Sequence, residues 1–231
     1  MSEAKSSPAV MTEVELEVLD HPAAALGARL AARGLAGETI VLTGGSTIGR
    51  AYERAAESKD WSASSLWWGD ERCVAADDER SNYGLAKRTL LDRLEAQPAV
   101  HRIRGELEPA AAAAEYERQL GGVELGLLLL GLGSDGHIAS LFPGSPQLAE
   151  RKRLVTSGPA ALDPLVERVT LTLPALLSAR ETWLLATGEE KAQAVAQAFR
   201  GPVSDEVPAS LLRRGNGRIV ALLDPAAASR L

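Results

Sequence analysis

Segments that resemble strands alternate with segments that resemble helices along almost the whole chain. "TEVELEV" at 12–18 alternates polar and apolar residues, as a half-buried strand does, and the stretch after it carries Leu26 and Leu30 at helical spacing. The pattern recurs until "GRIVALL" at 217–223. Because crossover helices join parallel strands, this alternation predicts an α/β protein with a largely parallel sheet that helices cover on both faces.

Between these two strands the sequence predicts five more, most of them followed by a helical segment. They are 38–43, 64–70, 101–105, 123–130 and 181–187. A chain of 231 residues with 45% apolar residues can bury one large core. No Gly/Ser-rich linker and no internal repeat divides it, so we expect a flexible tail at 1–10 and a single domain at 11–231.

The overall charge restricts what the protein can bind. The formal net charge is -6, so no general basic field attracts nucleic acid or an anionic membrane, and any anion must be held by a few local cations. The first ten residues have no apolar signal region, and no apolar stretch approaches the roughly 20 residues that span a bilayer. We therefore expect a cytoplasmic protein with a small ligand.

Three polar loops follow expected strands, at 43–46, 69–73 and 131–137. In open parallel sheets, ligands bind beyond the carboxyl ends of the strands, so these loops are expected to converge on one pocket. "TGGS" puts Gly44, Gly45 and Ser46 between a strand and a helix, where backbone N–H groups favour a phosphate or carboxylate. An ordinary capped turn explains this loop equally well.

The second loop, "GDERC", gathers Asp70, Glu71 and Arg72 behind an apolar strand. A solvated charged loop is the simpler interpretation of the composition, but a strand end in a parallel sheet favours function. Arg72 offers a planar fork for a phosphate or an oxyanion. Cys73 is the only cysteine, which excludes an internal disulfide, and nothing around it suggests a lowered thiol pKa, so a buried structural role is expected.

The third loop, "GLGSDGH", sets Asp135 and His137 two residues apart in a glycine-rich bend. An imidazole here can act as a base near neutral pH. The glycines match GxGxxG literally, but Pro143 and Gly144 interrupt the helix that a dinucleotide site requires, so we reject NAD binding. No paired metal ligands accompany His137, and we expect no metal. His21 and His101 have the setting of structural or solvated residues.

Two cations complete the candidate set. Arg168 lies at the start of "RVTLTL", and Lys191 lies in the first turn of an expected helix. A lysine near a helix N-terminus is mildly unfavourable to the dipole, which indicates a bound anion. Taken separately, solvated side chains explain each of them.

Together, "LTGGST", "WWGDERCVAADDERSNYGLAK", "LLLLGLGSDGHIASLFPGSP", "RVTLTLPALL" and "ATGEEKAQAV" resemble the 6-phosphogluconolactonase family over nearly the whole chain. The resemblance implies a three-layer α/β/α fold with a mainly parallel, Rossmann-like sheet of the sugar-phosphate-isomerase type. It also implies hydrolysis of 6-phospho-D-glucono-1,5-lactone in the oxidative pentose phosphate pathway, without metal or organic cofactor. The expected partner is therefore a phosphorylated sugar lactone, and a monomer and a homodimer both remain open.

The same resemblance implies roles for the site residues. His137 would activate water, Asp135 would orient it, and Arg72 would stabilise charge on the substrate. The phosphate would be held by Arg168, Lys191 and the loop Gly44 to Ser46, and Asp70 is counted with the substrate-binding residues.

Two positions depart from the family pattern. Ile48 stands where relatives have a proline, a change that should leave the backbone N–H array intact. No histidine follows "PASLL", and Arg213 and Arg214 are the candidates to replace it.

Two other functions stay open at this point. A glucosamine-6-phosphate deaminase has the same fold, but that family resembles this chain less, because Arg72 stands where a tyrosine is common and Phe142 where a carboxylate is common. A sugar-phosphate sensor without turnover is the second alternative. The retained Asp135 and His137 count against it, because binding alone needs cations more than a base.

Overall fold

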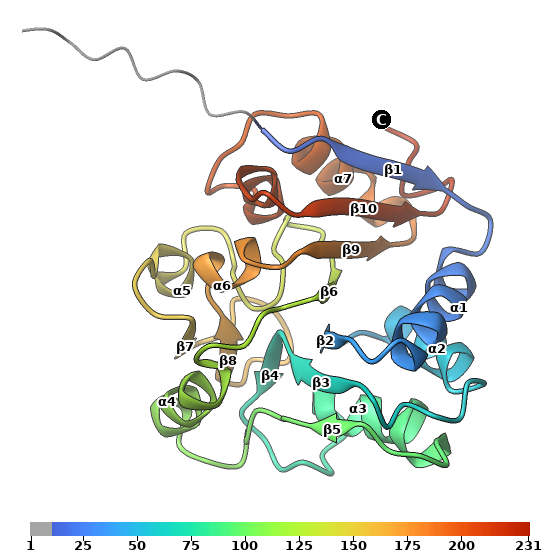
Figure 1. Ribbon diagram of the computed structural model, residues 1–231. Coiled ribbons are helices and arrows are strands. Elements are labelled where there is room, and N and C mark those ends of the chain that lie inside the picture. Colours follow the sequence, from blue (N-terminus) through green and yellow to red (C-terminus); the bar gives the residue numbers. More distant parts are fainter. Residues whose placement is uncertain (1–10) are drawn as a thin grey trace, which may run out of the picture.

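The computed structural model describes residues 11–231, and the predicted tail at 1–10 lies outside the described residues. Its main sheet has seven strands in the order β1-β10-β9-β6-β2-β3-β5, and every neighbouring pair is parallel (Figure 1). The strands are β1 (Val14–Val18), β2 (Thr39–Leu42), β3 (Ser65–Trp68), β5 (Ala99–Val100), β6 (Leu127–Gly131), β9 (Glu181–Ala186) and β10 (Arg218–Leu223). The predicted α/β fold with a mainly parallel sheet is confirmed.

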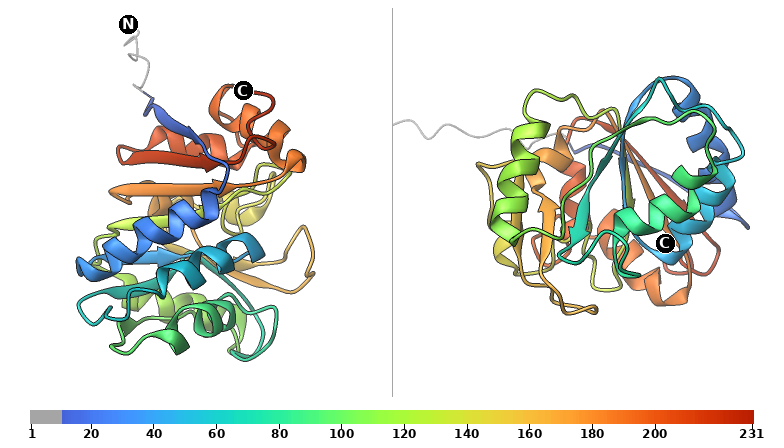
Figure 2. Two further views of the ribbon diagram at one scale, coloured as in Figure 1. Left: turned by 90° about the vertical axis from the view of Figure 1, so that its right-hand side faces the viewer. Right: turned by 90° about the horizontal axis from the view of Figure 1, so that it is seen from below.

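Helices cover both faces of this sheet (Figure 2). On one face lie α1 (Pro22–Leu35), α2 (Ser46–Ala55) and α3 (Asn82–Thr89), and on the other lie α4 (Pro109–Leu120), α5 (Pro146–Ala149) and α6 (Leu173–Leu177). The remaining helices are α7 (Ala192–Phe199) and the 3₁₀ helices η1 (Leu91–Arg93), η2 (Glu189–Lys191) and η3 (Pro208–Arg214). The central strand β6 is buried on both sides, since its four leucines, 127–130, are fully inaccessible.

The strand order explains where a ligand can enter. After β2, the next strands of the chain, β3 and β5, are added on one side of β2 in the sheet. After β6, the next strands, β9 and β10, are added on the opposite side. The loops that leave the neighbouring strands β2 and β6 therefore diverge, which opens a crevice at the carboxyl ends of these two strands.

A second, antiparallel sheet was not predicted. It has the order β4-β8-β7, with β4 at Asp70–Arg72, β8 at Arg168–Leu171 and β7 at Val155–Gly158. Gly69 joins the two sheets, because its N–H donates to Leu42 (2.9 Å) and its carbonyl accepts from Leu171 (2.8 Å). The segment "DER" is therefore a buried strand in this structure, and the expectation of a loop over 69–73 is wrong for its middle.

The prediction of a strand at 101–105 is also wrong. The edge strand β5 ends at Val100, and Arg102 and Arg104 then both turn to Glu106, with N···O distances of 2.7 Å and 3.3 Å. The polar and apolar residues alternate here because a bent loop buries Ile103 while both arginines contact the same carboxylate. Within residues 11–231, no helix is both long enough and apolar enough to cross a bilayer.

Candidate active site

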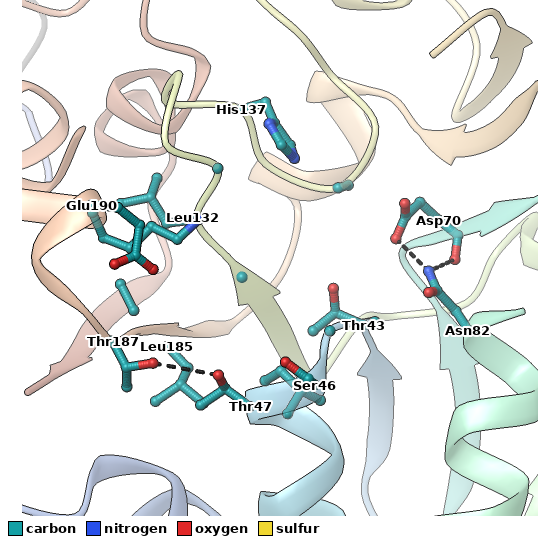
Figure 3. Close-up of a pocket in the computed structure, with 18 of the residues that line it drawn as sticks. Thr43, Ser46, Thr47, Asp70, Asn82, Leu132, His137, Leu185, Thr187 and Glu190 are labelled. Atoms are coloured by element: carbon teal, nitrogen blue, oxygen red, sulfur yellow. Dashed lines mark hydrogen bonds between the residues drawn. The ribbon is translucent and has the colours of Figure 1, made fainter. Parts of the chain in front are cut away.

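The three polar strand-end loops meet at one pocket, as the sequence predicts (Figure 3). The pocket has a volume of about 380 Å³, within the usual range for small-molecule sites. It lies in the crevice between the ends of β2 and β6. Its lining comprises residues 43–48, Asp70, Arg72, Asn82, residues 131–133, His137, Ala139, residues 185–187, Glu190 and Lys191.

His137 is held by Asp135 from its own loop. Nδ1 of His137 lies 2.6 Å from Oδ1 of Asp135, which also accepts the His137 backbone N–H at 3.1 Å. Because a carboxylate can only accept, Nδ1 carries the hydrogen of this bond, and the other ring nitrogen, Nε2, is free to accept a proton. The imidazole projects into the pocket, and its side chain is 23% exposed (Figure 3).

The loop before His137 is shaped by a close approach. A Cβ on Gly133 would lie 2.0 Å from Nδ1 of His137 and 2.5 Å from the Asp135 carboxylate, so only glycine leaves room for the pair. On its other side the ring packs against Phe142 with a centroid distance of 4.6 Å. The imidazole is therefore confined by its neighbours before any ligand arrives.

The GGS loop ends in the N-terminus of α2. Gly45 is the N-cap and Ser46 the first helical residue, so the first-turn N–H groups are oriented toward the pocket side of the helix. Ile48 is buried in that first turn, and the helix begins here without a proline. The departure at Ile48 thus leaves the helix start in place.

Arg72 and Arg168 lie directly opposite each other on β4 and β8. Burial and the nearby Arg72 charge hold the pKa of Arg168 below its ordinary value. The Nε atoms of both guanidiniums are buried without a hydrogen-bond partner in the described part of the chain, while Arg72 donates to the Arg80 carbonyl and Arg168 to that of Pro164. Two adjacent, incompletely bonded cations favour an anion at this end of the pocket. Arg72 lines the pocket, whereas Arg168 is buried and does not belong to its lining.

Lys191 reaches the pocket from the opposite wall, where it is the N-cap of α7. Beside it, the carboxylate of Glu190 points into the pocket (Figure 3). Sequence reasoning missed Glu190, whose only signal is its position next to Lys191. An acid at this wall opposes the attraction of the lysine for an anion.

Glu71 is buried and organises the helix that follows. Its Oε1 accepts hydrogen bonds from the backbone N–H groups of Arg72 and Asn82 (2.7 Å each). Its Oε2 accepts hydrogen bonds from the backbone N–H of Tyr83 (2.8 Å) and from the hydroxyl of Ser81 (3.0 Å). Burial raises the pKa of Glu71, and these four hydrogen bonds oppose that rise. The Glu71 carboxylate therefore caps the N-terminus of α3, although Glu71 itself lies outside the helix.

Cys73 lies outside this pocket and lines a separate groove with residues 105–107. Burial, with the negative charges of Glu167 and Glu71, raises the pKa of its thiol to about 11. Its thiolate is thus disfavoured near neutral pH. No group of three or more potential metal ligands comes together within residues 11–231.

The prediction that Arg213 or Arg214 replaces the missing histidine in the pocket is wrong. The side chain of Arg213 donates to the Gly201 carbonyl (2.8 Å), and neither Arg213 nor Arg214 belongs to the pocket lining. The 3₁₀ helix η3 instead contributes through its backbone, because the N–H of Ala209 donates to the Gly136 carbonyl at 2.9 Å. Sequence reasoning also missed Thr43, Thr47, Asn82 and Thr187 in the lining, where only their proximity to predicted loops could have indicated them.

Comparison with known proteins agrees with this geometry. A sequence model described as glucosamine-6-phosphate isomerases/6-phosphogluconolactonase matches residues 11–221. The chain belongs to this family. The 6-phosphogluconolactonase of Streptomyces coelicolor is 40% identical to it over 222 residues, which cover 87% of this chain and 84% of the relative. The predicted resemblance is confirmed, and the chain is an enzyme of this family.

Solved structures give the same result. The 6-phosphogluconolactonase of Trypanosoma brucei superposes with a TM-score of 0.82 at 29% identity, over 95% of this chain and 98% of that one. A monomeric glucosamine-6-phosphate deaminase superposes with a TM-score of 0.81 at 19% identity, over 95% of this chain and 100% of that one. The second likeness shows the common fold alone.

Proposed function

We propose that this protein hydrolyses 6-phospho-D-glucono-1,5-lactone to 6-phospho-D-gluconate, the second step of the oxidative pentose phosphate pathway. The lactonases among its relatives support the reaction class. The observation that carries the proposal is the His137–Asp135 pair, 2.6 Å apart, in the same pocket as Arg72 and Lys191. A base and cations in one pocket suit an anionic substrate that is attacked by water.

In this proposal His137 is the general base. Nε2 takes a proton from water as the water oxygen attacks the lactone carbonyl, and Asp135 keeps Nδ1 protonated and stabilises the imidazolium that forms. The tetrahedral intermediate then collapses, the bond between the carbonyl carbon and the ring oxygen breaks, and the imidazolium returns the proton to that oxygen. The acid product ionises, so one proton is released per turnover. No covalent nucleophile is required.

The cations have separate roles in this proposal. Arg72, which lines the same pocket as His137, stabilises charge on the lactone, and its guanidinium is incompletely hydrogen-bonded within the protein. Lys191 and the loop Gly44 to Ser46 hold the phosphate, whereas Arg168, expected to share this role, is buried outside the pocket lining and acts on an anion only through its charge beside Arg72. Asp70, expected among the substrate-binding residues, is given no substrate contact in this proposal, because its two carboxylate oxygens accept hydrogen bonds from Ser140 and Asn82. A fixed phosphate orients the ring for attack.

A deaminase fits the pocket less well. The residue at 142 is Phe142, which is buried and packs on the imidazole of His137, so the carboxylate expected there for a ring-opening proton relay is missing. Arg72 likewise replaces the expected tyrosine. Both differences favour water attack on a lactone.

The proposal is tested by lactone hydrolysis in a pH-stat, corrected for the spontaneous rate, with glucosamine 6-phosphate and an ammonia assay in parallel. We expect acid release well above background and no ammonia. Ammonia release would establish the deaminase instead. Binding of 6-phosphogluconate without faster hydrolysis would establish a sensor. A single lactonase domain over 11–231, a cytoplasmic location and the oligomeric state stay predictions.

A further inference from the structure

Asp70 connects the two walls of the pocket through buried hydrogen bonds. Its Oδ2 accepts the hydroxyl of Ser140 at 2.7 Å, and its Oδ1 accepts the side-chain amide of Asn82 at 3.0 Å. All three side chains are buried, with exposures of 6%, 2% and 1% for Asp70, Ser140 and Asn82. We propose that these three residues, the Asp70 bridge, set the distance between His137 and the GGS loop, with Ser140 as a positioning residue for hydrolysis.

The Ser140 end of the bridge fixes the His137 loop. Ile138 and Leu141 pair across a tight turn, and Ala139 in this turn lines the pocket with φ at 49°, a left-handed conformation that is unfavourable for alanine. Ser140 anchors the turn twice, because its hydroxyl donates to Asp70 and its backbone N–H donates to Thr170 Oγ1 at 3.2 Å. The turn that follows His137 directly is thus tied to both strands β4 and β8.

The Asn82 end of the bridge fixes the GGS loop. The amide of Asn82 also donates to the Asp70 carbonyl at 2.9 Å, which sets the orientation of its side chain. Its Oδ1 packs so closely on the loop that a Cβ on Gly44 would lie 1.9 Å away. The position of the Gly44 backbone is therefore restricted by the side chain of Asn82.

The bridge links two loops that share no direct hydrogen bond, because it is hydrogen-bonded to the His137 loop through Ser140 and packs on the GGS loop through Asn82. In the part of the chain that the structure describes, no hydrogen bond joins residues 43–48 to residues 131–142. The GGS loop holds the phosphate and His137 activates water in the proposed function, on which this inference rests. A shift of one loop against the other separates the base from the lactone carbonyl while the phosphate stays bound, and small misplacements of this kind are costly in rate.

The test compares Ser140→Ala with Ser64→Ala in the full chain. Ser64 is a matched control, because it is also 2% exposed and its hydroxyl donates to the Gly34 carbonyl at 2.6 Å, before the amino end of β3. Each variant loses one buried hydrogen bond, so both should show a similar fall in Tm. We expect kcat to fall about tenfold in Ser140→Ala only, with KM and the Kd for 6-phosphogluconate within about twofold of wild type.

A second variant separates the bridge from a charged role of Asp70. Asp70→Asn can still accept from Asn82, and its new amide can donate to the Ser140 hydroxyl, so the bridge persists without the charge. We expect kcat within about threefold of wild type. A loss of 100-fold or more would make Asp70 a catalytic base and overturn the assignment, as would wild-type kcat in Ser140→Ala or an equal loss in Ser64→Ala.

If Ser140→Ala does not fold, Ser140→Cys keeps the volume with a weaker donor, and the same fall in kcat at unchanged KM is expected. The wild-type measurement distinguishes the two proposals. An inactive wild-type protein overturns the proposed function, whereas an active one with unaltered Ser140 variants overturns the bridge alone.

Discussion

At the scale of single residues, the pocket depends on side chains whose positions are set by a glycine or a carboxylate beside them. Gly133 leaves room for the imidazole of His137, and Asp135 fixes which ring nitrogen faces the pocket. The pair could be predicted from the sequence because both residues lie in one short loop. Asn82 and Ser140 could not, because they lie 12 and 70 residues from Asp70, their common partner.

His137→Asn should fold normally and lower kcat by roughly 10²–10⁴-fold, the usual contribution of a positioned base, with KM nearly unchanged. His101→Asn is the control, since His101 stacks on Trp67 outside the pocket at 4.1 Å. Background-corrected turnover equal to wild type would exclude His137 as the base.

Cys73 should react slowly with alkylating reagents in the folded protein. Its pKa of about 11 lies above the ordinary thiol value, so the neutral form dominates up to pH 11 and at pH 8 the thiolate fraction is on the order of 10⁻³. Labelling by iodoacetamide should therefore be about 100-fold slower than after unfolding and should accelerate with rising pH. Cys73→Ser should retain most activity. Loss comparable to that of His137→Asn would indicate a thiol nucleophile instead.

At the scale of secondary structure, the main sheet could be predicted and the second sheet could not. Strands such as β6 carry continuous apolar runs that only a buried parallel strand needs. In contrast, β4 consists of Asp-Glu-Arg, which reads as a solvated loop. The charge of Glu71 is buried because residues 81–83, at the start of a later helix, donate hydrogen bonds to its carboxylate. Such compensation between distant segments leaves no local pattern.

Glu71→Gln should destabilise the protein by about 2 kcal/mol, because an amide at Oε2 would set a donor against the N–H of Tyr83 and remove acceptors from the start of α3. For a chain of this size, Tm should fall by roughly 4–8 °C in calorimetry. Glu79→Gln, at an exposed position before the same helix, is the control and should leave Tm unchanged. An unaltered Tm in Glu71→Gln would contradict the capping role.

At the scale of the whole molecule, the pocket exists because two halves of one sheet are built in opposite directions from β2 and β6. One half supplies the GGS loop and Arg72, and the other supplies His137 and Lys191. Groups for an anion and for a proton transfer thus converge from both halves. A ligand that binds them all must span the crevice, as a sugar with a phosphate at one end and a carbonyl at the other does.

This arrangement predicts that the phosphate dominates substrate choice. Two cations, Arg72 and Lys191, and the N–H groups of the GGS loop converge on the pocket of a protein with a net charge of -6, so unphosphorylated gluconolactone should be a poor substrate. Lys191→Ala should raise KM by about 10- to 100-fold with kcat little changed, since the contact is equal in ground and transition states. Lys152→Ala removes the same charge at an exposed position outside the pocket and should change neither constant. Equal kcat/KM for the two lactones would contradict the phosphate role of Lys191 and the GGS loop, because a neutral sugar gains nothing from them.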